Sequence, residues 1–115
     1  MTTTVTPSES ITYKTLSMHF DEDGFLFDPS LWTPGLAHEI AILDGIGPLI
    51  KEHFLIIDYV REHYLRLGAM PLMRRVCRVN NLHKNAVKKL FGSCRTMWRV
   101  AGLPNPGEEA KTYMI

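Results

Sequence analysis

Cysteine is scarce in this sequence of 115 residues, which contains only Cys77 and Cys94 and no Cys-x-x-Cys pair. A disulfide framework is therefore not expected, and both thiols are predicted to be reduced. Long apolar runs are also missing, since no stretch approaches the roughly 20 residues that a membrane-spanning helix needs. The N-terminal segment has no basic residue before Lys14 and no apolar block, so we expect neither a signal peptide nor a membrane anchor. The expected compartment is the cytoplasm.

Motifs of self-contained active sites are absent as well. No glycine-rich phosphate loop, nucleophile elbow or metal-ligand spacing occurs. His53 and His63 follow glutamates in a short apparent repeat, but their separation along a helix, about 15 Å of rise and about 80° of rotation, prevents them from sharing a metal ion. The acidic run from Asp21 to Asp23 is interpreted as a solvated turn. We therefore predict no metal site, no cofactor and no enzyme with a self-contained active site.

A hydrophobic content of 45% in a chain of this length is sufficient for one domain with a single core. Residues 1–12 are rich in serine and threonine without periodicity and are expected to be disordered. Residues 13–106 are predicted to form the domain. Gly102, followed by Leu103 and Pro104, has the pattern of a firmly terminated helix, and residues 107–115 are predicted to be a flexible C-terminal arm.

The net charge of +1 hides a strong asymmetry between the two halves of the chain. Residues 1–60 contain nine carboxylates against two basic side chains, whereas residues 61–115 contain three carboxylates against eleven. A basic half attracts nucleic acid or an acidic protein surface. The alternative is that the two halves fold against each other and neutralise much of this charge.

The pattern of apolar residues predicts a mostly α fold, a small helical bundle with one N-terminal β-hairpin. The stretch SMHFDEDGFLF, residues 17–27, alternates apolar and polar side chains around a turn and predicts the hairpin. Asp28-Pro29 and Thr33-Pro34 each predict a helix start, because a capping side chain precedes a proline. The longest periodic stretch ends at Gly68 and predicts a core helix.

Two short helices with an outward basic side are predicted between Met70 and Phe91, separated by an Asn80-Asn81 break. Leu72, Met73, Val76 and Val79 are expected to form the apolar side of the first. The pair has the outline of a helix-turn-helix, so DNA or another nucleic acid is one candidate partner. The six candidate contact residues are Arg74, Arg75, Arg78, Lys84, Lys88 and Lys89.

Cys94 is the better placed of the two thiols for chemistry. Ser93 is predicted to cap the last core helix, so Cys94 lies at its first position, where the helix dipole and Arg95 favour a thiolate. A sulfur-carrying thiol is one interpretation, and a half-buried apolar filler is the other. No second cysteine or base lies near in the sequence.

Three stretches together resemble the DsrC/TusE family, the proteins related to the gamma subunit of dissimilatory sulfite reductase and to the sulfur relay of tRNA 2-thiouridine synthesis. They are DEDGFLFDPSLW at 21–32, KEHFLIIDYVREHYLRLG at 51–68 with the Pro71 and Arg74/Arg75 segment after it, and LFGSCRTMWRVAGLPNP at 90–106. The resemblance implies a small helical protein with a hairpin and a mobile C-terminal arm. It also implies a role in which a cysteine near the end of the arm presents sulfur to a large protein partner.

The sequence departs from this family at both thiol positions. Counted back from Ala101, the place of the upstream cysteine is taken by Trp98, and the place of the arm cysteine is taken by Glu109. Our leading hypothesis is therefore a family member that acts by protein binding, as a regulatory or competing partner in sulfur metabolism. The predicted contact residues are Glu109, Tyr113, Met114 and Ile115. A sulfur carrier that uses Cys94 is the second hypothesis.

Overall fold

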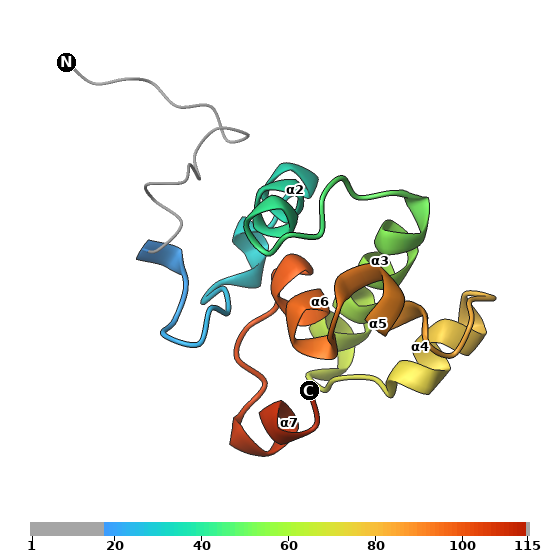
Figure 1. Cartoon of the computed structure of the whole chain (residues 1–115). Helices are drawn as coiled ribbons and strands as arrows, with labels where there is room; N and C mark the ends of the chain where they lie inside the picture. Colours follow the sequence, from blue (N-terminus) through green and yellow to red (C-terminus); the bar gives the residue numbers. More distant parts are fainter. Residues whose placement is uncertain (1–17, 115) are drawn as a thin grey trace.

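The computed structural model of the chain describes residues 18–114, and the order of its helices is shown in Figure 1. The elements are the 3-10 helix η2 (Pro29–Leu31) and the α-helices α2 (Pro34–Leu43), α3 (Lys51–Leu67), α4 (Met73–Val79), α5 (Ala86–Phe91), α6 (Cys94–Val100) and α7 (Glu108–Thr112). The predicted mostly α class is confirmed. The segment 1–12, expected to be disordered, lies outside the described residues.

Three of the predicted helix boundaries are confirmed by capping contacts. The hydroxyl of Thr33 accepts a hydrogen bond from the backbone N–H of Leu36 at the start of α2, at 3.0 Å. Ser93 accepts from the N–H of Thr96 at the start of α6, at 3.1 Å. Each cap satisfies one of the N–H groups that the first turn of a helix leaves without a partner. Gly68 ends α3 in the left-handed conformation, with φ of 73°.

The predicted N-terminal hairpin is reduced to a turn with a single antiparallel bridge between Phe20 and Leu26. No β-strand forms within residues 18–114, and residue 17 lies outside them. The carboxylate of Asp21 accepts hydrogen bonds from the N–H groups of Asp23 and Phe25, both at 2.9 Å. This side chain closes the turn locally, and such local closure competes with the ladder of a hairpin.

The basic pair of helices also differs from the prediction. Asn80 and Asn81 end α4, but α5 begins only at Ala86, with Asn85 at its N-cap position. A six-residue link, 80–85, therefore separates the two helices in place of a tight turn. On α4 the buried residues are Val76 and Cys77, while Leu72 and Val79, predicted to face the core, are 74% and 53% exposed.

The core is centred on α6, which packs against α2, α3 and α5. Its side chains at Met97, Trp98 and Val100 are fully buried. From α3 they meet Ile56, Ile57 and Val60, which are also fully buried. Each large apolar side chain removed from water contributes about 1.5 to 3 kcal/mol, so this contact is the main support of the fold.

His53 is the one buried polar side chain among the described residues. Its Nδ1 accepts a hydrogen bond from the N–H of Ile50, and its Nε2 donates to the carbonyl of Leu90, at 3.0 and 2.9 Å. The ring thus joins the start of α3 to the end of α5. Within residues 18–114, no group of three or more His, Cys, Asp or Glu residues is arranged to hold a metal ion.

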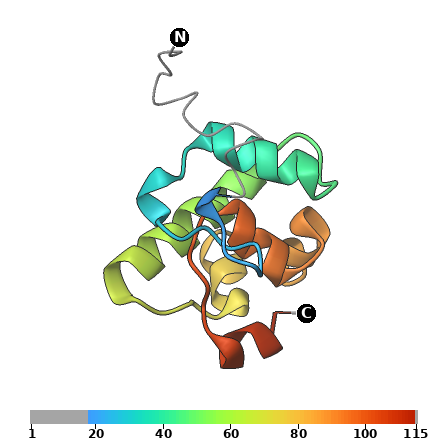
Figure 2. The ribbon, with the colours of Figure 1, turned by 90° about the vertical axis from the view of Figure 1, so that its left-hand side faces the viewer.

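The C-terminal arm is folded in the structure. Residues 108–112, expected to belong to a flexible segment, form α7, and Met114 is buried. Both views place α7 at the opposite end of the molecule from α2 (Figures 1 and 2). The arm returns to the body because its end carries an apolar side chain and a lysine that find partners there, as described next.

Candidate functional site

The arm leaves the body at Ala101–Pro104, and two tryptophans and an arginine hold this root. The indole N–H of Trp32 donates to the carbonyl of Val100, at 2.8 Å. The guanidinium of Arg61 donates to the carbonyls of Ala101, at 2.9 Å, and of Pro29, at 3.1 Å. It also stacks over the ring of Trp32, 4.4 Å from its centroid. The root is thus fixed by charge-assisted hydrogen bonds to backbone carbonyls, which are stronger than neutral ones.

Gly102 explains why the root has a glycine. Its φ is 66°, in the left-handed region, and a Cβ added there would overlap the ring of Trp32. Two requirements therefore coincide at this position, a positive φ and the absence of a side chain. The predicted helix stop at Gly102 is confirmed.

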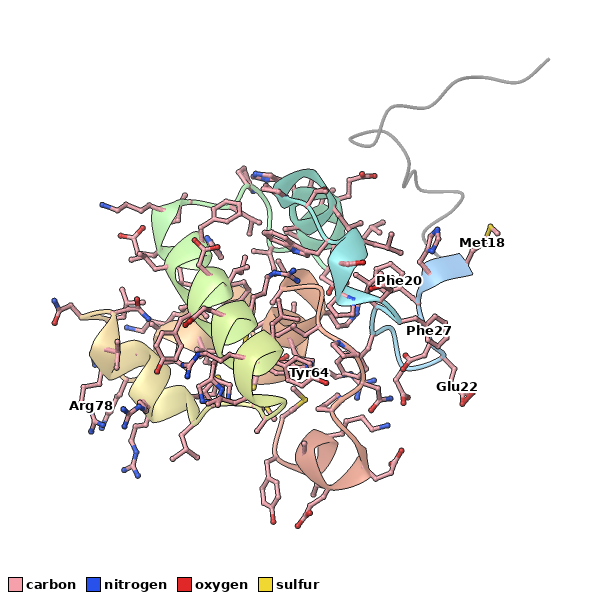
Figure 3. All side chains as sticks on the ribbon, turned by 180° about the vertical axis from the view of Figure 1, so that it is seen from behind. Met18, Phe20, Glu22, Phe27, Tyr64 and Arg78 are labelled. Atoms are coloured by element: carbon pink, nitrogen blue, oxygen red, sulfur yellow. The ribbon has the colours of Figure 1, made fainter. Side chains whose placement is uncertain are left out.

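Trp98 occupies the centre of the site. The side chain is fully buried and packs edge-to-face on Tyr64, with 5.5 Å between ring centroids. Its indole N–H donates to the carbonyl of Pro104, at 2.8 Å, so it holds the arm as well as the core. Figure 3 shows Tyr64 on α3, next to the segment that leads into the arm. Trp98 is thus a structural anchor of both the core and the arm.

Beyond the root, the acidic turn at the N-terminal end of the body holds the arm. The amide of Asn105 donates to the carboxylates of Asp21 and Asp23, at 3.0 and 3.2 Å. Lys111 on α7 donates to Asp23 at 2.6 Å and to Glu108 at 2.8 Å. Arg95 approaches Asp23 from α6, at 3.8 Å. The turn at Asp21–Asp23, interpreted from the sequence as merely solvated, is therefore the part of the body that binds the arm.

The ion pair of Asp23 and Lys111 shifts both titrations in the direction that favours the charged forms. The hydrogen bond from Lys111 lowers the pKa of the Asp23 carboxyl. The hydrogen bond to Asp23, together with that to Glu108, raises the pKa of Lys111. The side chain of Lys111 is only 11% exposed, whereas that of Asp23 is 35% exposed. The pair is a contact at the edge of water, and surface pairs of this kind are weak individually.

The last described residue, Met114, returns to α6. Its side chain is 2% exposed, and its carbonyl accepts a hydrogen bond from the N–H of Arg95, at 3.2 Å. An open pocket of about 480 Å³ lies beside it, between α7, the start of α6 and the segment before α4. Its lining is mostly apolar: Met70, Pro71, Leu72, Met73, Cys94, Glu109, Ala110, Tyr113 and Met114. We refer to it as the arm pocket.

Cys94 lines the arm pocket, but its chemistry differs from the expectation. Burial raises the pKa of the Cys94 thiol to about 11. The thiol is therefore protonated at neutral pH, whereas the sequence favoured a thiolate because of its place at a helix start. The cause is desolvation of the half-buried side chain, which disfavours the charged thiolate. Cys77 is buried in the core, as expected.

The four arm residues predicted to bind a partner have different surroundings. Glu109 and Tyr113 are exposed at the arm pocket, with Tyr113 78% exposed. Met114 is buried against the body instead of being offered to solvent. Ile115 lies outside the described residues. Asn105 and Lys111, which hold the arm, were not identified from the sequence, although a lysine in a tail opposite an acidic turn is a usable signal.

The six basic candidates for nucleic-acid contact are not brought together. Arg74, Arg75 and Arg78 surround one hollow of about 310 Å³ with Leu72. Lys89 lines a different hollow, beside Asp44. Lys84 and Lys88 are exposed. The helix-turn-helix interpretation is not supported by this arrangement or by the six-residue link between α4 and α5.

Within residues 18–114, no helix has the length and apolar character required to cross a membrane.

Comparisons with known proteins agree with this geometry. Residues 12–108 match the family described as DsrC like protein. The gamma subunit of the dissimilatory-type sulfite reductase of Nitratidesulfovibrio vulgaris (strain Hildenborough) is 32% identical over 98 residues, which cover 84% of this chain and 93% of the relative. The sulfurtransferase TusE of Escherichia coli (strain K12) is 30% identical, with coverage of 75% and 86%.

Solved structures show the same fold. The oxidized gamma subunit of the dissimilatory sulfite reductase (DsrC) from Archaeoglobus fulgidus superposes with a TM-score of 0.66 at 30% identity, covering 77% of this chain and 89% of that one. The structure titled dissimilatory sulfite reductase I (DsrI) gives a TM-score of 0.69 at 29% identity, with coverage of 76% and 86%. With most of its length matched in sequence and in structure, this chain belongs to the DsrC-like family.

Proposed function

We propose that this protein acts in sulfur metabolism by binding a protein partner, as a regulatory or competing member of its family, and that its arm offers contacts in place of a thiol. The observation that carries the proposal is the burial of Trp98, whose indole fills the core and anchors Pro104. An indole cannot hold sulfane sulfur. Glu109, at the place of the arm cysteine, cannot do so either.

The tip of the arm supports a binding role of its own. The family match ends at residue 108, so Lys111, Tyr113 and Met114 lie beyond it. These residues nevertheless make specific contacts or are displayed beside the arm pocket. Tyr113 is 78% exposed, and exposed aromatic side chains next to a pocket are typical of interface anchors. Release of the tip would add Met114 to the surface that a partner can contact.

The relatives indicate the kind of partner. One is a subunit of a dissimilatory sulfite reductase, and the other is a sulfurtransferase. The remaining sulfite reductase subunits and the sulfur-relay proteins are therefore the partners that we propose, with the cytoplasm as the compartment.

Complex formation tests the proposal directly. The purified full chain is mixed with the remaining subunits of a dissimilatory sulfite reductase, and separately with sulfur-relay sulfurtransferases, at micromolar concentration. We expect a complex in one of these mixtures by analytical ultracentrifugation. Absence of any complex in both would overturn the proposal.

A matched pair of variants locates the contact. Tyr113→Ser removes an exposed aromatic from the arm, and Phe27→Ser removes an exposed aromatic from the acidic-turn region, where the side chain is 64% exposed. We expect Tyr113→Ser to weaken the complex by about tenfold or more, because truncating an interface aromatic costs about 2 kcal/mol. Phe27→Ser should leave the affinity unchanged. Equal effects of both variants would show that the arm has no special role.

Sulfur transfer through Cys94 is the competing function, because the thiol does line an open pocket. In that reaction the Cys94 thiolate would attack the outer sulfur of a persulfide donor, forming a Cys94 persulfide and releasing the donor as a thiolate. Intact-mass measurement after incubation with a persulfide donor decides between the functions, with Cys94→Ser and Cys77→Ser as controls. The raised pKa of Cys94 leads us to expect no added sulfur at neutral pH. A gain of one sulfur that only Cys94→Ser removes would favour the carrier.

A further inference from the structure

The outer side of α4 exposes apolar side chains that its own fold does not use. Leu72, at the N-cap position, is 74% exposed, and Val79, at the last position, is 53% exposed. The sequence pattern directs both toward a core, yet the helix buries Val76 and Cys77 instead. Exposed large apolar residues that gather on one face are characteristic of binding surfaces.

Three arginines accompany these apolar residues. Arg74, Arg75 and Arg78 are exposed and surround the hollow of about 310 Å³, with Leu72 as its apolar member. Arg78 points away from the body (Figure 3). None of the three forms an ion pair with a carboxylate of residues 18–114, although Arg61, Arg95 and Arg99 all make specific contacts within the body. Three neighbouring like charges repel one another, so this cluster favours an anionic ligand.

This hollow adjoins the arm pocket, because Leu72 lines both. Tyr113, which is also exposed, lines the arm pocket together with Leu72. The result is one continuous surface that runs from the arginines through Leu72 to the arm. We call it the α4–arm face and define it by Leu72, Arg74, Arg75, Arg78 and Tyr113.

We propose that the α4–arm face binds an acidic amphipathic helix of a protein partner. An apolar side chain of that helix enters the arm pocket beside Leu72 and Tyr113. Carboxylates on neighbouring turns pair with the guanidinium groups of the arginine hollow, where bidentate contacts give both strength and orientation. Binding of an amphipathic helix in an apolar groove with charged borders is a common recognition mode. This inference rests on the proposed binding function and names the chemistry of the partner.

Charge distribution favours a protein over a nucleic acid as the occupant. A phosphate backbone is bound by basic residues that follow a track, and here the lysines of α5 do not extend the arginine cluster, since Lys89 lies at a separate hollow with Asp44. The floor of the face is apolar, at Leu72 and the lining of the arm pocket. Apolar anchors bordered by arginine are the composition of protein interfaces.

A defined peptide assay tests the proposal without any sulfur-metabolism component. The probe is a fluorescein-labelled helical peptide of about four turns, with leucines on one side and glutamates on the adjacent side, added to the full-length protein. We expect saturable binding by fluorescence anisotropy. Arg74→Gln and Arg78→Gln should each weaken binding by about tenfold, since each removes a charge-assisted hydrogen bond to a carboxylate of the peptide. Leu72→Ser should weaken it by a similar factor.

Matched controls use the other basic residues and other probes. Lys84→Gln and Lys88→Gln remove charge from the same half of the chain at exposed positions outside the face, and they should leave the affinity within about twofold of the parent. A peptide with glutamine in place of glutamate, and a peptide with serine in place of leucine, should bind at least about tenfold more weakly.

Four results of the binding assays would overturn the proposal. They are no saturable binding of the acidic peptide, equal binding of the glutamine peptide, an effect of the lysine variants as large as that of the arginine variants, or tighter binding of an oligonucleotide of equal charge. Self-association of the protein that Arg78→Gln abolishes would also overturn it, because the occupant would then be a second copy. Failure of this inference is distinguishable from failure of the proposed function, since a sulfite reductase complex that Arg74→Gln and Arg78→Gln leave intact would overturn only the α4–arm face.

Discussion

The root and the tip of the C-terminal arm are held by different kinds of contact. At the root, Trp98, Ala101 and Leu103 are fully buried. The indoles of Trp98 and of the partly buried Trp32, and the partly buried guanidinium of Arg61, donate hydrogen bonds to backbone carbonyls. At the tip, the apolar side chain of Met114, the backbone hydrogen bond from Arg95 to Met114 and the ion pair of Asp23 and Lys111 at the edge of water hold a helix of five residues. A rigid root that carries a detachable tip is the arrangement expected for an arm aimed at a partner, because local opening free energies fall where buried contacts are few.

The largest loss of stability is expected when the Trp98 anchor of the root is removed. Trp98→Ala should lower the free energy of unfolding by about 4 kcal/mol, because it leaves a cavity in the core and removes the hydrogen bond to Pro104. Chemical denaturation checks this value. Trp32→Phe, which keeps a ring but loses the hydrogen bond to Val100, should cost about 1 kcal/mol. Equal losses from the two variants would contradict the central role of Trp98.

The next largest loss of stability is expected from substitution of Gly102 at the root. Gly102→Ala should cost about 3 kcal/mol, since the new Cβ overlaps Trp32 and a residue with a side chain is strained at positive φ. Gly68→Ala is the matched control, because its φ of 73° is similar while an added Cβ meets no atom of the described residues within 4 Å. It should cost about 1 kcal/mol. Thermal unfolding of both variants separates overlap from backbone strain.

At the tip, Met114→Ser should have a smaller effect on global unfolding than a core substitution would. The arm can detach while the body stays folded, so the loss cannot exceed the free energy of docking the tip, and we expect about 1 kcal/mol. Hydrogen exchange at the N–H of Arg95, which donates to the carbonyl of Met114, is the specific reporter. We expect this amide to exchange at least about fivefold faster while core amides of α3 are unchanged. Slow exchange at Arg95 in the variant would show that another contact holds the tip.

The smallest effects on docking of the tip are expected from the ion pair of Asp23 and Lys111. The direction in which each group changes docking with pH follows from its pKa shift. The pKa of Asp23 is lowered in the folded state, so its contribution is present above the ordinary carboxyl range near about pH 4 and is lost as pH falls through the folded value. The pKa of Lys111 is raised, so its contribution is present below about pH 10 and lost at still higher pH. The protection of the Arg95 N–H, which is its exchange rate relative to the intrinsic rate at the same pH, should therefore fall at both extremes.

Lys111→Gln tests directly whether the ion pair contributes to docking of the tip. It should remove most of the acid-induced change in protection at Arg95, and it should also make tip docking less sensitive to salt. Arg66→Gln is the matched control, since Arg66 pairs with Glu62 on the exposed side of α3 at 3.3 Å and does not contact the arm. An unaltered pH profile in Lys111→Gln would show that the ion pair does not hold the tip.

Sequence reasoning was most successful where contacts are local. The caps at Thr33 and Ser93 and the stops at Gly68 and Gly102 depend on a few neighbouring residues, and each was located correctly. It failed where a distant segment decides the outcome. Asp21 bonds its own neighbours and Asn105, so a predicted hairpin became a turn that receives the arm.

The candidate site shows the same division. The sequence directs attention to Trp98, but its double role as core filler and anchor of Pro104 requires the structure. The start of a helix suggested a thiolate at Cys94, whereas burial by residues of other segments raises its pKa to about 11. Leu72 and Val79 follow a helical pattern, yet only packing shows that the core does not reach them.

The family, the helical class and the helix ends at Gly68 and Gly102 therefore follow from the sequence, because each depends on residue type and spacing. Only the tertiary structure shows that the arm is docked and that the acidic turn binds it. It also shows that the arginines of α4 lie beside exposed apolar residues. These features join residues up to 88 positions apart in the chain, as Asp23 and Lys111 are, and no local pattern encodes such a contact.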